Sequence, residues 1–345
     1  MGLTSFLVTH FPYDSPLRRH GKWLYEELRT RARAVLPWKQ LERVPPPSLH
    51  IETTNICNAN CIFCAYQYQK VWRAGKGVMD DELFERVLRE FKEMGGEEVS
   101  FTPIVGDPLV DPDIVHRIAR VCSEGLTVSF FTNGILFNRI DVEALVKTGI
   151  AKIFLSTSPF DEQSHRAVYR TNHYSDLLNG VARLLRARND AAAPLRVYIE
   201  FRSPVSAEET FNFPDFIDKI RPLLTSEEQH AVRIQTKGYD SWAGQIASDD
   251  LVGIMEMAIP PRLKNRPCLR TFLPSVLYDG TVRACSCIFA PPEAGTSDDG
   301  LTIGHLNDAT FQEIWQGEKL RAVRRTFTTG KLLPVCAQCT RYRSC

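Results

Sequence analysis

The stretch that decides the fold is Leu49-His-Ile-Glu-Thr-Thr-Asn-Ile-Cys57-Asn-Ala-Asn-Cys61-Ile-Phe-Cys64. A short β-rich run is followed at once by three cysteines with the spacing C-x3-C-x2-C. Three thiolates on one tight loop can bind three irons of a cubic iron–sulfur cluster, which leaves the fourth iron open to a small molecule. The alternative is a structural zinc site, but such a site normally takes four protein ligands and no fourth Cys or His lies near this loop.

Outward from this motif, six β-rich runs alternate with helical patterns after the break at Pro45-Pro46-Pro47. The expected strands are 49–53, 98–102, 127–132, 152–156, 195–201 and 231–236. The expected helices are 80–94, 111–124, 138–148, 174–189 and 208–223, with N-caps at Asp80 or Asp81, Asp113, Asn138 and Ser175. This alternation predicts an α/β fold, in which right-handed βαβ units wind a parallel sheet into an open sheet or a partial barrel.

Composition narrows the class of protein. The 345 residues include 42 Lys and Arg against 41 Asp and Glu, so no nucleic-acid partner is expected. No apolar run approaches the roughly 20 residues that span a bilayer, and Met1–Val8 lacks the features of a signal peptide. We therefore expect a cytoplasmic protein with no membrane partner. Disulfides rarely persist in that compartment, yet nine of the ten cysteines fall in two zones, which indicates metal or cofactor ligation.

The cysteine motif after the first strand, with Phe63 at its aromatic position, resembles the signature of radical S-adenosylmethionine (radical SAM) enzymes, which fold as a partial (βα)6 barrel. The resemblance implies that Cys57, Cys61 and Cys64 hold a [4Fe–4S] cluster whose open iron chelates S-adenosyl-L-methionine. It further implies that an electron from a flavodoxin- or ferredoxin-type reductant cleaves the sulfonium, and that the resulting 5′-deoxyadenosyl radical abstracts hydrogen from a C–H bond. The cofactor carries this chemistry, while the barrel positions the substrate and excludes water.

Further segments resemble the family, one strand end at a time, over residues 49–236. Val105-Gly106-Asp107-Pro108 corresponds to the family's Gly-Gly-Glu-Pro, whose backbone receives the methionine amino group; two of the four letters differ. Thr132-Asn133-Gly134 matches the family's Thr-Asn-Gly after the third strand. Ser156 resembles a residue that contacts S-adenosylmethionine. Arg170 resembles an arginine that pairs with the methionine carboxylate, an arrangement suited to a bidentate guanidinium fork.

The second group of cysteines follows the pattern Cys268-x11-Gly280-x4-Cys285-x-Cys287, then Cys336-x2-Cys339-x5-Cys345. This pattern resembles the SPASM extension of radical SAM enzymes, which carries auxiliary iron–sulfur clusters. Two complete clusters need eight thiolates and six are present. The resemblance therefore implies one auxiliary [4Fe–4S] cluster, and its simplest ligand set is Cys268, Cys285, Cys336 and Cys339. Cys287 and Cys345 are left over, although the x5 spacing also makes Cys345 a candidate ligand. A zinc ribbon built from the same cysteines is the alternative.

The chain is expected to comprise an N-terminal helical extension (1–48), the partial barrel (49–240) and a small C-terminal β-hairpin and helix domain of the SPASM or shortened "twitch" type (241–345). Gly280 fits the hairpin turn that would bring Cys285 back toward Cys268. The extension looks too short for a leader-peptide-binding domain, which favours a small-molecule substrate.

Enzymes with a shortened extension include 2-deoxy-scyllo-inosamine dehydrogenase, which oxidises a secondary alcohol. The resemblance favours an oxidoreductase of natural-product (antibiotic) biosynthesis that oxidises a hydroxyl-bearing carbon of a small polyol, sugar or aminocyclitol to a ketone. In the run 195–202, apolar and polar residues alternate, and the polar face of a barrel strand points inward unless it meets solvent at an open edge. Candidate polyol-binding or base residues at these strand ends are Glu200, Arg202, Lys237, Tyr239 and Asp240. Trp242 is a candidate for stacking on a sugar ring or for core packing.

Three alternatives stay open. A radical epimerase would quench the substrate radical with a thiol hydrogen, for which Cys287 or Cys345 qualifies. A maturase would modify a ribosomal precursor peptide. A silent iron–sulfur electron carrier or zinc scaffold would not cleave S-adenosylmethionine at all.

Overall fold

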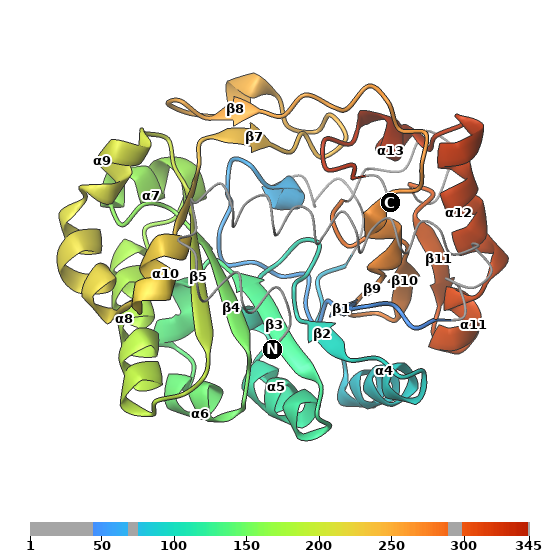
Figure 1. Cartoon of the computed structure of the whole chain (residues 1–345), viewed down its shortest axis with the longest axis horizontal. Helices are drawn as coiled ribbons and strands as arrows, with labels where there is room; N and C mark the ends of the chain where they lie inside the picture. The colour runs from blue at the N-terminus through green and yellow to red at the C-terminus, as the bar shows by residue number, and fades with distance from the viewer. Residues whose placement is uncertain (1–43, 68–74, 289–298, 344–345) are drawn as a thin grey trace.

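The sheet of the protein is built from strands of both halves of the sequence. The computed structural model describes residues 44–67, 75–288 and 299–343, shown as the coloured ribbon in Figure 1. Nine strands pair in the order β11-β10-β9-β1-β2-β3-β4-β5-β6. The parallel part is formed by β1 (Leu49–Ile51), β2 (Glu98–Ser100), β3 (Thr127–Thr132), β4 (Lys152–Thr157), β5 (Arg196–Arg202) and β6 (Arg233–Gln235). The predicted α/β partial barrel is confirmed, and all six predicted strands are present with ends shifted by at most two residues.

Helices cover one face of this sheet because alternate strand residues are apolar. On β5, Val197, Ile199 and Phe201 are buried in the core. The covering helices are α4 (Asp81–Glu93), α5 (Ile114–Ser123), α6 (Val142–Lys147), α7 (Glu162–Tyr169), α8 (Tyr174–Asp190), α9 (Ala207–Phe211) and α10 (Ser226–Ala231). Figure 1 shows α4, α5, α6 and α8 along the lower and left side of the sheet. The other face of the strands, which carries residues 198, 200 and 202 on β5, lines the inside of the partial barrel.

Three helix expectations need correction. The predicted helix 208–223 is broken into α9, a π-helical turn and a 3-10 turn, because Pro214 and Pro222 interrupt the backbone N–H series. The helix expected from Asn138 begins at Val142, where Asp141 accepts a hydrogen bond from the Ala144 N–H. His173, and not Ser175, is the N-cap of α8. Asp80 and Asp113 are N-caps as predicted.

The C-terminal third joins the barrel at the free edge of β1. Strand β9 (Ser275–Val276) runs parallel to β1, and β10 (Thr281–Arg283) and β11 (Thr302–His305) follow as antiparallel neighbours. The predicted hairpin at Gly280 is confirmed, with a φ of +88° that favours glycine. Helices α11 (Phe311–Trp315), α12 (Glu318–Thr329) and α13 (Pro334–Gln338) complete this part (Figure 1).

A separate two-stranded sheet, β7 (Lys237–Tyr239) and β8 (Glu256–Met257), connects the two halves. The expected helical extension falls almost entirely on residues 1–43, outside the described part of the chain. Within the described part, no helix is both long and apolar enough to cross a membrane.

Candidate active site

The three cysteines of the first motif lie in the loop that follows β1. Cys61 is buried, and Cys57 and Cys64 are half-buried. The loop is held against the end of α7 by two backbone hydrogen bonds, from Asn60 N–H to the Tyr169 carbonyl and from Ile62 N–H to the Val168 carbonyl. These bonds fix the loop on α7, and the three thiols lie close enough to influence one another electrostatically.

The electrostatics of this loop fit a positively charged iron–sulfur group. Burial raises the pKa of all three thiols, that of Cys64 to about 11, and the neighbouring thiols Cys57 and Cys64 raise that of Cys61 further. Since a thiolate is the ligand form, such thiols lose their protons only when iron compensates the charge. The Tyr66 N–H lies 3.5 Å from the Cys64 sulfur and the Asn133 amide 3.9 Å from that of Cys57, and such donors support bound thiolates. In the part of the chain that the structure describes, no three or more His, Cys, Asp or Glu side chains are placed to hold a single metal ion.

The loop after β2 packs directly on the cysteine loop. Gly106 has a φ of +120°, and a Cβ there would lie 2.8 Å from the Thr54 carbonyl oxygen, so only glycine fits. The neighbouring Asp107 is 2% exposed, and its N–H donates to the Ile56 carbonyl at 2.9 Å. Pro108 opens a 3-10 turn, η2 (Pro108–Val110), capped by the Asp107 carboxylate.

The end of β3 meets the same carboxylate. The Thr132 hydroxyl lies 2.9 Å from both Asp107 oxygens, and the Asn133 N–H donates to Asp107 at 2.8 Å. The Asn133 side chain donates to Asn58 in the cysteine loop. Burial raises the pKa of Asp107 to about 6, opposed by these hydrogen bonds. Asp107 thus connects the loop after β2 to the end of β3 through its carboxylate, and to the cysteine loop through its backbone N–H.

A polar pair occupies the inner face at the ends of β4 and β5. Arg202 Nε donates to the Ser156 hydroxyl at 3.0 Å, and its Nη2 lies 3.3 Å from Glu200 Oε2. The guanidinium lies 5.7 Å from the centre of the Phe63 ring. Phe63 directly precedes Cys64, so this pair stands beside the cysteine motif.

Deeper on the same inner face, three aromatic rings form a row across neighbouring strands. Phe131 stacks on Phe154 with ring centres 4.5 Å apart, and Phe154 stacks on Tyr198 at 5.2 Å. The strand register pairs these residues directly. Phe131 remains 38% exposed, so the row presents an apolar surface to the inside of the barrel.

The predicted site residues after β6, which are Lys237, Tyr239 and Asp240, do not lie together. Tyr239 is buried against the Phe63 ring, with its hydroxyl donating to the Gln235 carbonyl at 2.6 Å. Lys237 is exposed and pairs with Glu256 at 2.9 Å, on the separate sheet. Asp240 accepts hydrogen bonds from the Trp242 N–H and the Thr340 hydroxyl, and the second of these bonds connects it to the C-terminal segment.

Two further predicted residues, Trp242 and Arg170, contact the segment that carries or follows the first three cysteines. The Trp242 indole donates to the Phe63 carbonyl at 3.0 Å, which orients Phe63. Arg170 is exposed in a left-handed conformation at the end of α7, where it donates to Gln67 at 3.1 Å.

The later cysteines gather between the hairpin and the C-terminal segment. The thiol of Cys268 is an electrostatic neighbour of those of Cys285, Cys336 and Cys339. The thiols of Cys285 and Cys287 share a hydrogen bond that raises the pKa of Cys285 and lowers that of Cys287. Burial raises the pKa of Cys336 to about 12 and that of Cys339 to about 11. Cys345 lies outside the described residues.

Sequence reasoning missed two inward-facing residues on β1 and just beyond it. Glu52 is 1% exposed and accepts hydrogen bonds from Ile104 N–H at 2.7 Å and Val105 N–H at 3.4 Å, so it shapes the loop before Gly106. His50 has a pKa lowered to about 4 by burial. The sequence did contain a signal for these two residues: His50 and Glu52 alternate with the apolar Leu49 and Ile51, which indicates that they share the other face of the strand.

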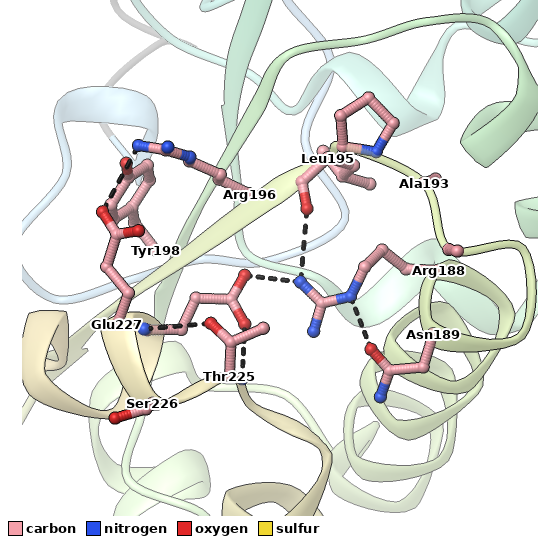
Figure 2. A pocket seen from close by; sticks show the side chains of 12 residues that line it. Arg188, Asn189, Ala193, Leu195, Arg196, Tyr198, Thr225, Ser226 and Glu227 are labelled. Carbon is pink, nitrogen blue, oxygen red and sulfur yellow. Dashed lines mark hydrogen bonds and ion pairs between the residues drawn. The ribbon is translucent and has the colours of Figure 1, made fainter. Parts of the chain in front are cut away.

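A cavity of about 580 Å³ lies away from the cysteines, at the start of β5 (Figure 2). Its buried charges are satisfied within the protein: Arg188 donates to Glu228 at 2.5 Å and to the Leu195 carbonyl at 3.2 Å. Glu228 also accepts from the Val197 and Thr225 N–H groups. We assign this cavity a structural role.

Two parts of the sequence match known protein families. Residues 51–197 match the Radical SAM superfamily, and residues 268–340 match SPASM, an iron–sulfur cluster-binding domain. A probable GTP 3′,8-cyclase of Pyrococcus abyssi is 24% identical in an alignment 218 residues long, which covers 56% of this chain and 69% of that protein.

Two solved structures share the fold. One is BtrN in complex with AdoMet and 2-DOIA, which is 15% identical with a TM-score of 0.51, over 85% of this chain and 92% of that one. The other is SuiB of Streptococcus suis bound to the precursor peptide SuiA, which is 15% identical with a TM-score of 0.58, over 93% and 76%. At such identities the likeness concerns the fold alone.

Proposed function

This chain belongs to the radical SAM superfamily and carries a C-terminal SPASM domain, and we propose that it oxidises a hydroxyl-bearing carbon of a small polyol, sugar or aminocyclitol to a ketone. Its cofactors are a [4Fe–4S] cluster, auxiliary iron–sulfur ligation by the SPASM domain and S-adenosylmethionine. Cys57, Cys61 and Cys64 would hold the first cluster, and Cys268, Cys285, Cys336 and Cys339 an auxiliary one. When bound, the first cluster with S-adenosylmethionine supplies a 5′-deoxyadenosyl radical as hydrogen-atom acceptor, and the auxiliary cluster supplies a one-electron acceptor.

The observation that carries the proposal is the pair Glu200–Arg202 on the inner wall beside Phe63. Oxidation of an alcohol removes a hydrogen atom from carbon, a proton from the hydroxyl and one electron. The Glu200 side chain is partly exposed. Its carboxylate can therefore accept a hydrogen bond from a substrate hydroxyl and then take up the proton of that hydroxyl as a general base. Arg202 holds that carboxylate in place and offers further N–H donors to neighbouring hydroxyls.

The aromatic row of Phe131, Phe154 and Tyr198 supports a ring-shaped substrate. It lies on the same face of the strands as Ser156 and Glu200, one side-chain row deeper, which is about 6.6 Å along a strand. Sugars and cyclitols have apolar C–H faces, and aromatic rings provide a large apolar surface for them. One wall of the barrel therefore offers hydrogen-bond partners for hydroxyl groups beside a surface for the ring.

The proposal is tested by anaerobic assay of the reconstituted enzyme with a panel of inositols, aminocyclitols and sugars, 2-deoxy-scyllo-inosamine among them. We expect a product two mass units lighter, formed in step with 5′-deoxyadenosine. Glu200→Gln should lower the yield of ketone per S-adenosylmethionine cleaved. Glu227→Gln should not, because Glu227 is a half-buried residue of α10 that pairs with Arg196 at the opposite end of β5. A product of unchanged mass that carries solvent deuterium would instead identify an epimerase, with Cys287 as the described candidate donor. Activity confined to a precursor peptide would identify a maturase.

A further inference from the structure

A lysine side chain is enclosed at the end of α13, beside the turn that carries two of the proposed auxiliary ligands. Lys264 is 6% exposed. Its Nζ lies 2.8 Å from each of three backbone carbonyl oxygens, those of Cys336, Ala337 and Cys339. An ammonium group has three N–H donors, so this site uses all of them.

The three carbonyls belong to one tight turn. The Cys339 N–H approaches the Cys336 carbonyl at 3.4 Å, and the Arg341 N–H lies 3.3 Å from the Cys339 sulfur. The last carbonyl groups of a helix have few N–H donors within the helix, so together they form a site that favours a cation. A lysine ammonium is a compact point charge and fits this site, whereas the planar fork of arginine cannot direct three bonds from one atom.

The buried charge also faces sulfur ligands. The thiols of Cys339, Cys336 and Cys268 and the Asp240 carboxylate interact electrostatically with Lys264, and each of them favours its charged form. The Asp240 carboxylate accepts a hydrogen bond from the Thr340 hydroxyl and forms an ion pair with Arg341 at 3.6 Å. A cluster held by these thiolates gains negative charge on reduction, and net charge and hydrogen bonding around the ligands set its potential.

We propose that Lys264 is a positioning residue of the auxiliary cluster: it holds the Cys336–Cys339 turn in its ligating shape and raises the reduction potential of the cluster bound there. The inference rests on the ligand set of the proposed function. It assigns Lys264 a role in holding and tuning an electron acceptor, which no motif in the sequence indicates.

The experiment uses the full chain with Cys57, Cys61 and Cys64 changed to Ala, so that only the auxiliary cluster is present. Lys264→Met removes the charge at similar length, Lys264→Arg retains it, and Lys319→Met removes an exposed lysine from the same domain. The midpoint potential is followed by EPR during a redox titration, and the loss of iron to a chelator is timed.

At the midpoint potential of the parent, we expect the reduced-to-oxidised ratio in Lys264→Met to fall about ten-fold, which corresponds to about 59 mV for one electron. Lys264→Arg should keep the potential but lose iron faster, and Lys319→Met should match the parent in both measurements. Loss of all auxiliary iron in Lys264→Met, with an unchanged circular dichroism spectrum, would also support the holding role.

Parental potential and parental iron retention in Lys264→Met would overturn the inference while leaving the ligand set intact. An equal drop in potential in Lys264→Arg would overturn the role of the charge. If the parent with the three Ala substitutions binds no iron, the ligand set itself is wrong and the inference falls with it.

Discussion

The hydroxyl of Thr132 lies 2.9 Å from both carboxylate oxygens of Asp107, joining the end of β3 to the loop after β2. Asp107 is also held by the Asn133 and Leu109 N–H groups. The Asp107 carboxylate therefore has its hydrogen-bond partners within the protein. A ligand would contact the backbone of this loop and not the carboxylate. Changes to the loop backbone should consequently weaken the binding of S-adenosylmethionine most directly.

Gly106→Ala should weaken S-adenosylmethionine binding at least ten-fold. The added Cβ would meet the Thr54 carbonyl at 2.8 Å at a φ of +120°, so strain of about 1–3 kcal/mol falls on the loop itself. The control is Gly95→Ala, which also has a positive φ but open space around the new methyl group. Equilibrium dialysis with labelled S-adenosylmethionine measures both, and equal affinities in the two variants would contradict the prediction.

Arg202→Lys should uncouple S-adenosylmethionine cleavage from product formation. A lysine cannot reach Ser156 and Glu200 together, so Glu200 loses its orientation. We expect the ratio of oxidised product to 5′-deoxyadenosine to fall several-fold. Arg196→Lys, an exposed position on the same strand that pairs with Glu227 at 3.3 Å, is the matched control and should keep the parental ratio.

Glu52 should make the cluster-free protein less stable as the pH rises. Burial raises its pKa from 4.5 to about 8, against the hydrogen bonds from Ile104 and Val105. The folded state then holds the proton more tightly than the unfolded state, so the free energy of unfolding falls between about pH 4.5 and pH 8. Relative to Glu52→Gln, the wild type should lose up to about 5 kcal/mol across this window. Urea titrations at several pH values would show it, and parallel curves would argue against it.

Glu228→Gln should destabilise the chain by about 3–5 kcal/mol, because it leaves the buried Arg188 guanidinium without its counter-charge. The pair lines the cavity of Figure 2 and is distant in sequence from the cysteines. Thermal unfolding measures the loss. Glu227→Gln, whose partner Arg196 is exposed, should change stability by less than about 1 kcal/mol.

Iron and acid-labile sulfide should reach about eight atoms each per reconstituted chain, and about four after Cys57, Cys61 and Cys64 are changed to Ala. Cys122→Ala, which removes a partly buried thiol on α5, should retain all eight. Zinc in place of iron at the second cysteine group would contradict the prediction and remove the proposed electron acceptor.

Local patterns determined much of the candidate site. The spacing of Cys57, Cys61 and Cys64 places three thiols on one loop whatever the surroundings, and the period-two alternation on β5 places Glu200 and Arg202 on one face. Gly280 marked the hairpin turn in the sequence, and its φ in the structure is positive. These are consequences of backbone geometry over a few residues, which is why they can be read from the sequence alone.

Only the tertiary structure decided which distant groups meet. Lys237 and Asp240 follow β6 closely, yet one pairs with Glu256 in solvent and the other holds Thr340, about a hundred residues away. The contact of Arg202 with Ser156 joins two strands, and the enclosure of Lys264 by the Cys336–Cys339 turn joins segments separated by 72 residues or more. The topology of the sheet brings these distant segments together, and buried charged groups must then find partners among the groups that lie nearby. Both depend on the whole fold.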